Sequence, residues 1–479
     1  MEIALIGEGA YPHQFGGVSV WCDQLVRGLP EHDFHVVALV ATGQEPVRWE
    51  LPGNVTKVTT IPLWGRTPFR PVLEGRARRR LLPAVEALLE TLVRPPQEGD
   101  AAFASALRDL AGSAQQMPLA PGLCSDDAVA ALSAIWRAHR DRDGLPELTL
   151  HDAVTVLRIL EHSLRPLAHP PLEADVCHIV TNGMAALPGL VTTWERATPL
   201  LVTEHGIYLR EQYLHSRASP LRWPVKHLML AFARRLCTVA YGEAATVAPG
   251  NAYNRRWEER LGAPPARIRT VYNGVDPAGF PLAEYEPDVP TIAWAGRIDP
   301  VKDLETLLRA FAAVRRVVPD ARLRCFGGTG PGGAPYLQRC EALAAELGVT
   351  DAVRFEGRVA DIREAYLAGH VVVLCSITEG FPYTLIEAMS CGRACVATEV
   401  GGVPEALGDA GLMVPPRAPD RLAGACVALL RDEALRHRLG AAARARILGA
   451  FTLDQAVTTY DEMYAFLGRG RDVPTAAGQ

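Results

Sequence analysis

Four charged side chains in the C-terminal half of the chain have types and spacings that suit one ligand. Arg297 and Lys302 stand five positions apart after a predicted strand, where two cations could neutralise a diphosphate. Glu379 and Glu387, eight positions apart, offer carboxylate oxygens that accept hydrogen bonds from hydroxyl groups. A ligand that presents both phosphates and hydroxyls, such as a sugar nucleotide, would match this set.

The segment that carries the two glutamates reads as a strand, a tight loop and a helix. Residues 371–374 are apolar, a Gly/Pro turn follows, and apolar residues then recur at helical spacing. We expect Pro382 in the first helical turn, with the N–H groups from Tyr383 to Leu385 pointing outward as an anion site. The simpler alternative is an ordinary strand–turn–helix unit with two surface glutamates.

A second set of candidates lies in the N-terminal half. Residues 3–6 form an apolar run typical of a buried parallel strand, and Gly16 and Gly17 precede a predicted helix. Such glycines let the backbone approach a ligand, although a plain turn explains them as well and a Gly-x-Gly-x-x-Gly pattern is absent. His205 follows the predicted strand 199–203, at the carboxyl end where open α/β sheets bind ligands. Most single histidines are structural, but a neutral imidazole there could hydrogen-bond a sugar hydroxyl.

After further predicted strands at 34–40 and 55–61, the hydrophobic period changes and residues from about 64 to 171 read as a helical insertion. Its helical patterns cover 78–92, 101–110, 126–139 and 151–164. Its first part holds an arginine cluster: Arg66, Arg70, Arg76, Arg78, Arg79 and Arg80. A solvated helix face explains this cluster, and a docking patch for an acidic or membrane-bound partner is the alternative.

A second series of strands and helices begins after residue 276. The predicted strands are 291–295, 323–327, 353–357, the apolar run that begins at 371, 394–398 and 411–414, with helices to about 450 and a last helix at 453–467. The alternation predicts an α/β fold with two Rossmann-like, doubly wound parallel-sheet domains facing a cleft. We expect one such domain at 1–248, a second at 249–450, and a C-terminal helix at 451–479 that packs back toward the first domain.

Composition limits the possible functions. The 479 residues are 48% hydrophobic and 22% charged, with a net charge of −5, which argues against a nucleic-acid partner. The ten cysteines show no metal-ligand spacing. Residues 1–7 do not resemble a signal peptide, and no apolar run reaches about eighteen residues. We therefore expect a cytoplasmic protein that could also sit against the inner face of the membrane.

Taken together and in order, these residues resemble the retaining GT-B glycosyltransferases of family 4. The resemblance spans nearly the whole chain, and within the family the residues before Trp21, the stretch around His205 and the long insertion resemble the PelF type. That type is the cytosolic transferase of Pel-type exopolysaccharide synthesis. The matching motifs are Gly16-Gly17-Val18, His205-Gly206, Asn273-Gly274-Val275-Asp276, Gly296-Arg297 with Lys302, Glu379-Gly380-Phe381-Pro382 with Glu387, and Gly401-Gly402-Val403-Pro404-Glu405.

The resemblance implies transfer of a hexose from a UDP-sugar, with UDP-glucose as the expected donor, to an acceptor hydroxyl with retention. It implies that Arg297 and Lys302 bind the diphosphate, Glu387 the ribose and Glu379 the sugar, with His205 near the reaction centre. It also implies that the first domain is the acceptor side and that the second binds the nucleotide sugar, and neither a metal nor another cofactor is expected. The implied catalytic residues are His205, Arg297, Lys302 and Glu379, and the implied donor-binding residues are Gly16, Gly17, Arg297, Lys302, Arg358, Gly380, Phe381, Pro382, Tyr383, Thr384, Leu385 and Glu387.

Several alternatives stay open at this point. The acceptor could be a saccharide or a lipid-linked molecule, and the insertion could dock to a membrane-bound polysaccharide-synthesis complex. A UDP-sugar epimerase or hydrolase of the same fold would use the same donor residues. A non-catalytic subunit of such a complex would keep the fold but would not need His205, Arg297, Lys302, Glu379 and Glu387 together.

Overall fold

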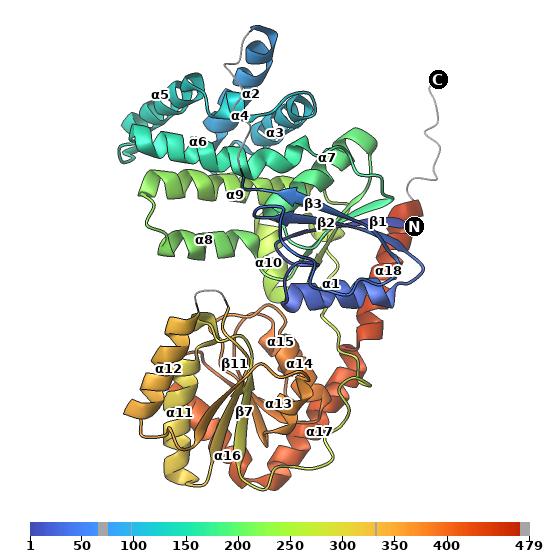
Figure 1. Cartoon of the computed structure of the whole chain (residues 1–479), viewed down its shortest axis with the longest axis vertical. Coiled ribbons are helices and arrows are strands. Elements are labelled where there is room, and N and C mark those ends of the chain that lie inside the picture. The colour runs from blue at the N-terminus through green and yellow to red at the C-terminus, as the bar shows by residue number, and fades with distance from the viewer. Residues whose placement is uncertain (66–74, 97, 331–332, 470–479) are drawn as a thin grey trace. The chain divides into compact units, whose positions relative to one another are not determined.

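The computed structural model describes residues 1–65, 75–96, 98–330 and 333–469, drawn in Figure 1. The chain divides into two compact units. Of the described residues, the first unit comprises those in 1–249, 255–270 and 460–469, and the second comprises those in 250–254 and 271–459. The sequence placed a domain boundary at 249, whereas this division groups 255–270 with the first unit.

The first unit is built on a six-stranded parallel sheet with strand order β3-β2-β1-β4-β5-β6. Its elements are β1 (Glu2–Glu8), α1 (Gly17–Gly28), β2 (Asp33–Val40), β3 (Val55–Pro62), α2 (Gly75–Val93), α3 (Asp100–Ala114), α4 (Ala120–Leu123), α5 (Asp126–Asp143), α6 (Leu150–Leu164), η1 (Arg165–Ala168), β4 (Val176–Ile179), η2 (Gly183–Ala185), α7 (Ala186–Arg196), β5 (Leu200–Glu204), α8 (Tyr208–Ala218), α9 (Trp223–Glu243), β6 (Thr246–Pro249), α10 (Ala252–Arg260) and η3 (Pro265–Arg267).

The second unit holds another six-stranded parallel sheet, with strand order β12-β11-β10-β7-β8-β9. Its elements are β7 (Thr291–Ala295), η4 (Pro300–Lys302), α11 (Leu304–Val317), β8 (Arg322–Phe326), α12 (Ala334–Glu346), β9 (Val353–Gly357), α13 (Arg363–Leu367), β10 (Val371–Leu374), α14 (Tyr383–Ser390), β11 (Ala394–Thr398), α15 (Val403–Leu407), β12 (Leu412–Val414), α16 (Pro419–Arg431), α17 (Glu433–Ala450) and the start of α18 (Leu453–Arg469).

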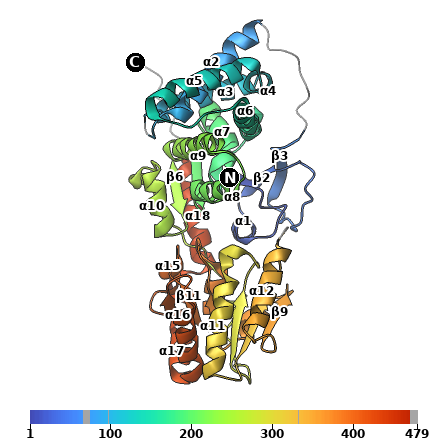
Figure 2. The ribbon, with the colours of Figure 1, turned by 90° about the vertical axis from the view of Figure 1, so that its left-hand side faces the viewer.

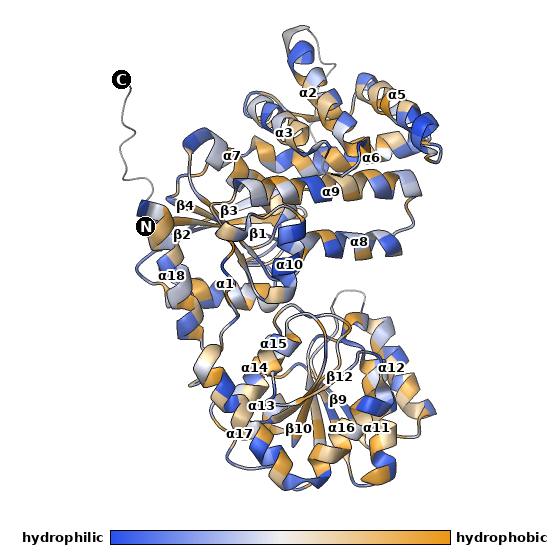
Figure 3. Cartoon of the chain, turned by 180° about the vertical axis from the view of Figure 1, so that it is seen from behind, coloured by the Kyte–Doolittle hydropathy of each residue, from blue (hydrophilic) through white to orange (hydrophobic). Residues whose placement is uncertain are grey.

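In both sheets successive strands are added first toward one edge and then, after a single reversal, toward the other. This is the doubly wound order, so the predicted pair of Rossmann-like sheets is confirmed. Buried apolar residues fill both faces of the second sheet, whose strands are hydrophobic in Figure 3. In each unit the strands are parallel, so their carboxyl ends lie along one edge of the sheet.

The insertion is helical, as predicted, and its helices α2 to α6 lie together in Figure 1. The apolar stripe of α2 is fully buried, and it shares one continuous core with the sheet of the first unit. α8 and α9 run side by side next to these helices (Figure 2). No helix among the described residues is both long and apolar enough to cross a membrane.

The described arginines of the cluster, Arg78, Arg79 and Arg80, are exposed, and two of them have side-chain partners. Arg78 forms a two-point ion pair with Asp127, with Nε and Nη2 at 2.9 and 2.8 Å from its carboxylate oxygens. Arg80 donates to the side chain of Gln116, and Arg79 is exposed. Arg66 and Arg70 lie outside the described residues, as does the side chain of Arg76.

The last helix, α18, is fixed to the first unit by aromatic and polar contacts. Tyr464 O–H lies 2.6 Å from Nδ1 of the fully buried His178, whose Nε2 lies 2.8 Å from the Thr203 hydroxyl. Tyr460 lies 3.3 Å from the same hydroxyl and contacts the ring of Trp21. The C-terminal part of α18 thus belongs to the core of the first unit.

Candidate active site

The predicted site residues of the second unit gather where its sheet reverses. β7 and β10 are neighbours, and their following connections leave on opposite sides. Arg297 and Lys302 follow β7, and Glu379 follows β10. Ligands of open α/β sheets bind outside the carboxyl ends of strands at this point, so the fold places these three residues where a ligand is expected.

Lys302 and Glu379 are in direct contact. Lys302 Nζ lies 2.5 Å from Oε1 of Glu379, and the two side chains are 22% and 10% exposed. Ser376 Oγ donates to the same carboxylate oxygen at 2.5 Å. The sequence analysis missed Ser376, although its position three residues before Glu379 places it on the same loop. A half-buried lysine is thus held at the switch point in a fixed position.

Arg297 and Arg358 lie beside a glycine-rich segment that follows β8. The Arg297 side chain is 62% exposed, and its nearest acid is Asp299 at 3.5 Å. A Cβ added to Gly328 would lie 3.0 Å from Nε of Arg358, and one added to Gly330 would lie 3.6 Å from Cδ of Arg297. A side chain at Gly328 would therefore crowd Arg358, whereas one at Gly330 would only reach van der Waals contact with Arg297. Pro331 and Gly332 of the same segment lie outside the described residues.

Glu387 is on the first helix after β10, but its carboxylate has a partner that sequence spacing did not indicate. The hydroxyl of the fully buried Tyr366 donates to it. Burial raises the pKa of Glu387 to about 7, and the Tyr366 hydrogen bond opposes this rise. Glu387 is therefore partly protonated near neutral pH, and it can both donate to and accept from hydroxyl groups.

The start of α14 differs from the prediction in detail. Pro382 is the N-cap residue, with φ −76° and ψ 118°, so the helix begins at Tyr383 and not at the proline. The Leu385 N–H donates to the Pro382 carbonyl at 3.2 Å. The prediction that this amide points outward is wrong in this structure, because the tight turn at the cap uses it.

Two glycines and an asparagine hold the Glu379 loop in place. Gly401 has φ +54°, and a Cβ there would come within 1.7 Å of the Glu379 carbonyl oxygen. The Gly402 N–H donates to the Gly380 carbonyl at 2.8 Å, and Asn273 Nδ2 donates to the Phe381 carbonyl at 2.9 Å. Motif residues distant in sequence therefore support the loop that carries Glu379.

In the first unit, Gly16 and Gly17 stand at the start of α1 and are exposed. A Cβ added to Gly16 would meet no atom within 4 Å, so open space lies beside this backbone. His205 follows β5 as predicted, and its ring contacts that of Trp21 with centroids 4.6 Å apart. Burial lowers the pKa of His205 to about 4, so its imidazole is neutral at physiological pH.

Next to His205 lies a pair of buried carboxyl groups that the sequence did not single out. Glu204 accepts from the Tyr208 N–H at 2.7 Å and from the Tyr241 hydroxyl. Glu258 is fully buried, and neither of its oxygens has a hydrogen-bond partner among the described residues. Burial, followed by the charge of Glu204, raises the pKa of Glu258 to about 9, so Glu258 is protonated at neutral pH. These residues are 54 positions apart, and only the fold brings them together.

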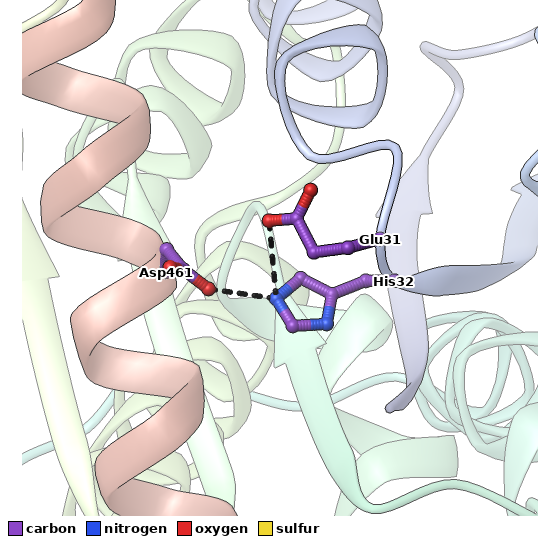
Figure 4. A group of neighbouring side chains, drawn as sticks. All are labelled: Glu31, His32 and Asp461. Carbon is purple, nitrogen blue, oxygen red and sulfur yellow. Dashed lines mark hydrogen bonds and ion pairs between the residues drawn. The ribbon is translucent and has the colours of Figure 1, made fainter.

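One group of side chains in the described part of the chain has ligand atoms close enough to hold a metal ion: Glu31, His32 and Asp461 (Figure 4). His32 Nε2 lies 2.8 Å from Asp461 Oδ1 and 3.9 Å from Glu31 Oε1. Both acids are about half exposed. An ordinary histidine–carboxylate hydrogen bond between α18 and the turn before β2 accounts for this arrangement.

Comparison with known proteins identifies the family. Residues 1–266 match a family model described as a domain of unknown function (DUF3492), and residues 289–432 match glycosyl transferases group 1. A D-inositol 3-phosphate glycosyltransferase of Acidothermus cellulolyticus is 30% identical over 349 residues, which cover 64% of this chain and 75% of that relative. The chain belongs to the group 1 glycosyltransferases. Its N-terminal part is a DUF3492 domain.

Other relatives match over shorter stretches. D-inositol 3-phosphate glycosyltransferases of Streptomyces bingchenggensis and Saccharomonospora viridis are 34% and 35% identical over 227 and 233 residues. Each alignment covers 44% of this chain and 50% or 54% of the relative. The chain thus spans about half the length of these curated relatives.

Solved structures agree on the fold. Anabaena HepE in complex with UDP and glucose has a TM-score of 0.61 at 15% identity, covering 97% of this chain and 99% of that one. Sucrose-phosphate synthase of Thermosynechococcus elongatus has a TM-score of 0.63 at 20% identity, covering 98% and 99%. The expected GT-B fold is therefore confirmed.

Proposed function

We propose that this protein is a retaining hexosyltransferase that moves a hexose from a UDP-sugar to an acceptor hydroxyl. The observation that carries the proposal is the contact between Lys302 and Glu379, with Arg297 on the same connection, at the switch point of the second sheet. The group 1 family membership and the relatives named as glycosyltransferases support it. HepE, which has been solved with UDP-glucose, supports a UDP-hexose donor.

In this proposal the second unit binds the donor. Arg297 and Lys302 neutralise the diphosphate. Arg358 assists in this, because it lies beside the glycine-rich segment after β8, as Arg297 does. Glu387 binds the ribose hydroxyls, and Glu379 shares its oxygens between Lys302 and a sugar hydroxyl. Backbone and side chains of Gly380, Phe381, Pro382, Tyr383 and Thr384 line the donor.

The first unit supplies the remaining residues. The exposed backbone at Gly16 and Gly17 approaches the donor closely, because no side chain occupies that space. His205 is neutral and hydrogen-bonds a hydroxyl of the transferred sugar. A protonated histidine would instead add positive charge beside a carbon that itself becomes positive in the reaction.

Transfer proceeds with attack on the face that the leaving group occupies. The bond from the anomeric carbon to the β-phosphate oxygen breaks, the acceptor oxygen bonds to that carbon, and its proton passes to the departing phosphate. Negative charge grows on UDP as it leaves, and the preorganised Arg297 and Lys302 stabilise it. No pair of carboxylates is assigned as nucleophile and acid.

The biological setting we propose is exopolysaccharide biosynthesis, as for the PelF type. The helical insertion shares the core of the first unit, so it shapes the acceptor side. A cytoplasmic location fits a nucleotide-sugar donor, and a membrane-bound synthesis complex would supply or remove the acceptor.

A nucleotide-sugar screen tests the proposal. The protein is incubated with UDP-, GDP- and ADP-hexoses and candidate acceptors, and release of the nucleotide is followed with and without acceptor. Acceptor-dependent release of UDP supports the transferase. Release of UDP or epimerisation that is equally fast without acceptor would assign the epimerase or hydrolase alternative, and the absence of turnover with every donor would favour a non-catalytic subunit.

A further inference from the structure

A cavity of about 270 Å³ lies at the carboxyl edge of the first sheet. Trp64 follows β3, Met184 follows β4, and Tyr208 begins the helix after β5, and all three line it. The insertion helix α6 contributes Ile159, and α9 contributes Leu230. The cavity thus lies at the edge where doubly wound sheets bind ligands, yet none of its lining residues was a predicted site residue.

The lining is mostly apolar. Ten of the seventeen lining residues have aliphatic, aromatic carbocyclic, indole or methionine side chains, including Met184 and Met229, whose flexible thioethers adapt to varied apolar shapes. A bare saccharide needs hydrogen-bond partners around its whole ring, whereas apolar side chains outnumber the polar ones in this lining. The walls therefore favour an alkyl chain over a sugar ring.

The charge of the lining has one sign. The described lining residues include no aspartate or glutamate, whereas Lys226 is half-buried on α9 and His215 stands on α8. Within the described residues, no carboxylate lies within ion-pair distance of Lys226. A half-buried ammonium group beside an apolar cavity is complementary to an anionic group attached to an alkyl chain.

Several apolar side chains are exposed around the cavity. Trp64 and Leu221, which line it, are 48% and 38% exposed, and Tyr213, Leu214 and Trp223 on α8 and α9 are 44–51% exposed. Figure 3 shows hydrophobic and hydrophilic residues mixed along α8. Apolar residues at the rim suit a ligand whose chain enters the cavity from the outside.

We propose that this α8–α9 cavity binds the alkyl chain of an anionic amphiphile, with its phosphate at Lys226, and that this amphiphile is the acceptor. The proposal rests on the proposed transferase function, and it specifies the acceptor as lipid-like, in contrast to the inositol phosphate in the names of the relatives. The insertion helix α6 forms one wall of the cavity, so in this proposal the insertion takes a direct part in acceptor binding.

Calorimetric titration of the full chain with n-alkyl phosphates of increasing length, below their micelle concentrations, tests the binding. Burying one methylene group is worth about 0.8 kcal/mol, so affinity should rise about fourfold per added methylene and then level off when the cavity is full. Inositol phosphate should bind at least tenfold more weakly than octyl phosphate. Equal affinity for all chain lengths, or a preference for inositol phosphate, would overturn the proposal.

Two variants locate the site. Lys226→Gln should remove the preference for octyl phosphate over octanol, and Ala233→Met should fill the cavity and shorten the chain length at which affinity levels off. Arg217→Gln is the matched control, since Arg217 is an exposed cation on α8 outside the lining. If both variants bound phosphatidylglycerol vesicles as the wild type does, the lipid would bind the apolar surface and not the cavity. That result would overturn the proposal.

Kinetics separates this inference from the transferase proposal. Octyl phosphate should inhibit transfer competitively against the acceptor and leave the apparent constant for the UDP-sugar unchanged. Transfer that octyl phosphate at saturation does not inhibit would overturn the acceptor assignment while the transferase stands. If the protein bound octyl phosphate but transferred no sugar from any donor, the transferase proposal would be wrong. The acceptor role of the cavity would then be wrong as well.

Discussion

Lys302 Nζ lies 2.5 Å from Glu379 Oε1, and Ser376 donates to the same oxygen, so the lysine is held in position before any ligand arrives. A donor diphosphate therefore meets a preorganised cation and not a mobile surface lysine. The same contact links the connection after β7 to that after β10. It joins the two sides of the switch point in the second sheet.

Removing only the lysine should destabilise the second unit. In Lys302→Met the largely buried Glu379 carboxylate loses its cation, which should lower the free energy of unfolding by roughly 1–3 kcal/mol. The double variant Lys302→Met/Glu379→Gln should regain most of that loss, because no charge is left unpaired. Calorimetric unfolding measures both.

Arg315→Met is the control for this pair. Arg315 contacts Asp351 at 2.8 Å, but the Asp351 side chain is 66% exposed, so its loss should cost less than about 1 kcal/mol. If Lys302→Met were no more harmful than Arg315→Met, the buried pair would have no structural role.

Arg297→Ala and Glu387→Ala should damage the reaction in different ways. Arg297 faces charge that grows as UDP leaves, so its loss should lower kcat by about a hundredfold or more. Glu387 contacts the ribose in the ground and transition states alike, so its loss should mainly raise KM for the donor. Steady-state kinetics distinguishes the two, and a pure KM effect in both variants would mean that the roles are wrongly assigned.

Glu258 should make stability depend on pH. Its pKa is about 9 in the folded protein against an ordinary 4.5, so the folded chain holds a proton that the unfolded chain releases. The contribution of Glu258 to the free energy of unfolding is therefore fully present below about pH 4.5. It falls as pH rises toward 9, by at most about 1.4 kcal/mol per pH unit. Glu258→Gln and Glu258→Met should both reduce the loss of Tm between pH 6 and pH 8.

Both substitutions at Glu258 remove the titrating carboxyl group, but the glutamine keeps a buried polar group and the methionine does not. A change in pH slope that both variants share can therefore be attributed to the lost proton and not to the changed polarity. A pH slope that is the same in wild type and both variants would show that Glu258 carries no extra proton. The unfolding transition of the first unit is the relevant signal, since Glu258 belongs to that unit.

Chelation should leave activity intact. The proposed donor site balances the diphosphate with Arg297 and Lys302, and the one candidate metal cluster among the described residues is the hydrogen-bonded Glu31–His32–Asp461 group. Activity should therefore be unchanged after dialysis against EDTA. Loss of activity that magnesium or manganese restores would contradict this prediction.

The sequence predicted the elements whose signals are local. β7 was predicted at its observed bounds, and the α11 that follows it is capped by the Asp303 side chain, which accepts from the Thr306 N–H. α9 was missed because helices of the insertion and the sheet cover it on several sides, so its apolar residues form no single stripe. β6 has only four residues and ends in a proline, so its local signal is short.

The residues of the site were predictable but their partners were not. Arg297, Lys302 and Glu379 follow strand ends in the sequence, and strand ends converge in a parallel sheet. Tyr366 reaches Glu387, and Glu204 meets Glu258, only through tertiary packing, which no spacing along the chain encodes. The α8–α9 cavity was missed for the same reason, since five separate segments build its walls.

The anomeric configuration of the product tests the central claim most directly. The protein is given a UDP-α-hexose and an acceptor that supports UDP release, and the new glycosidic linkage is assigned by proton NMR. A retaining transferase should give an α-linked product, and formation of that product should require Arg297 and Lys302. A β-linked product, or an α-linked product formed equally fast by the Arg297→Ala and Lys302→Met variants, would contradict this claim.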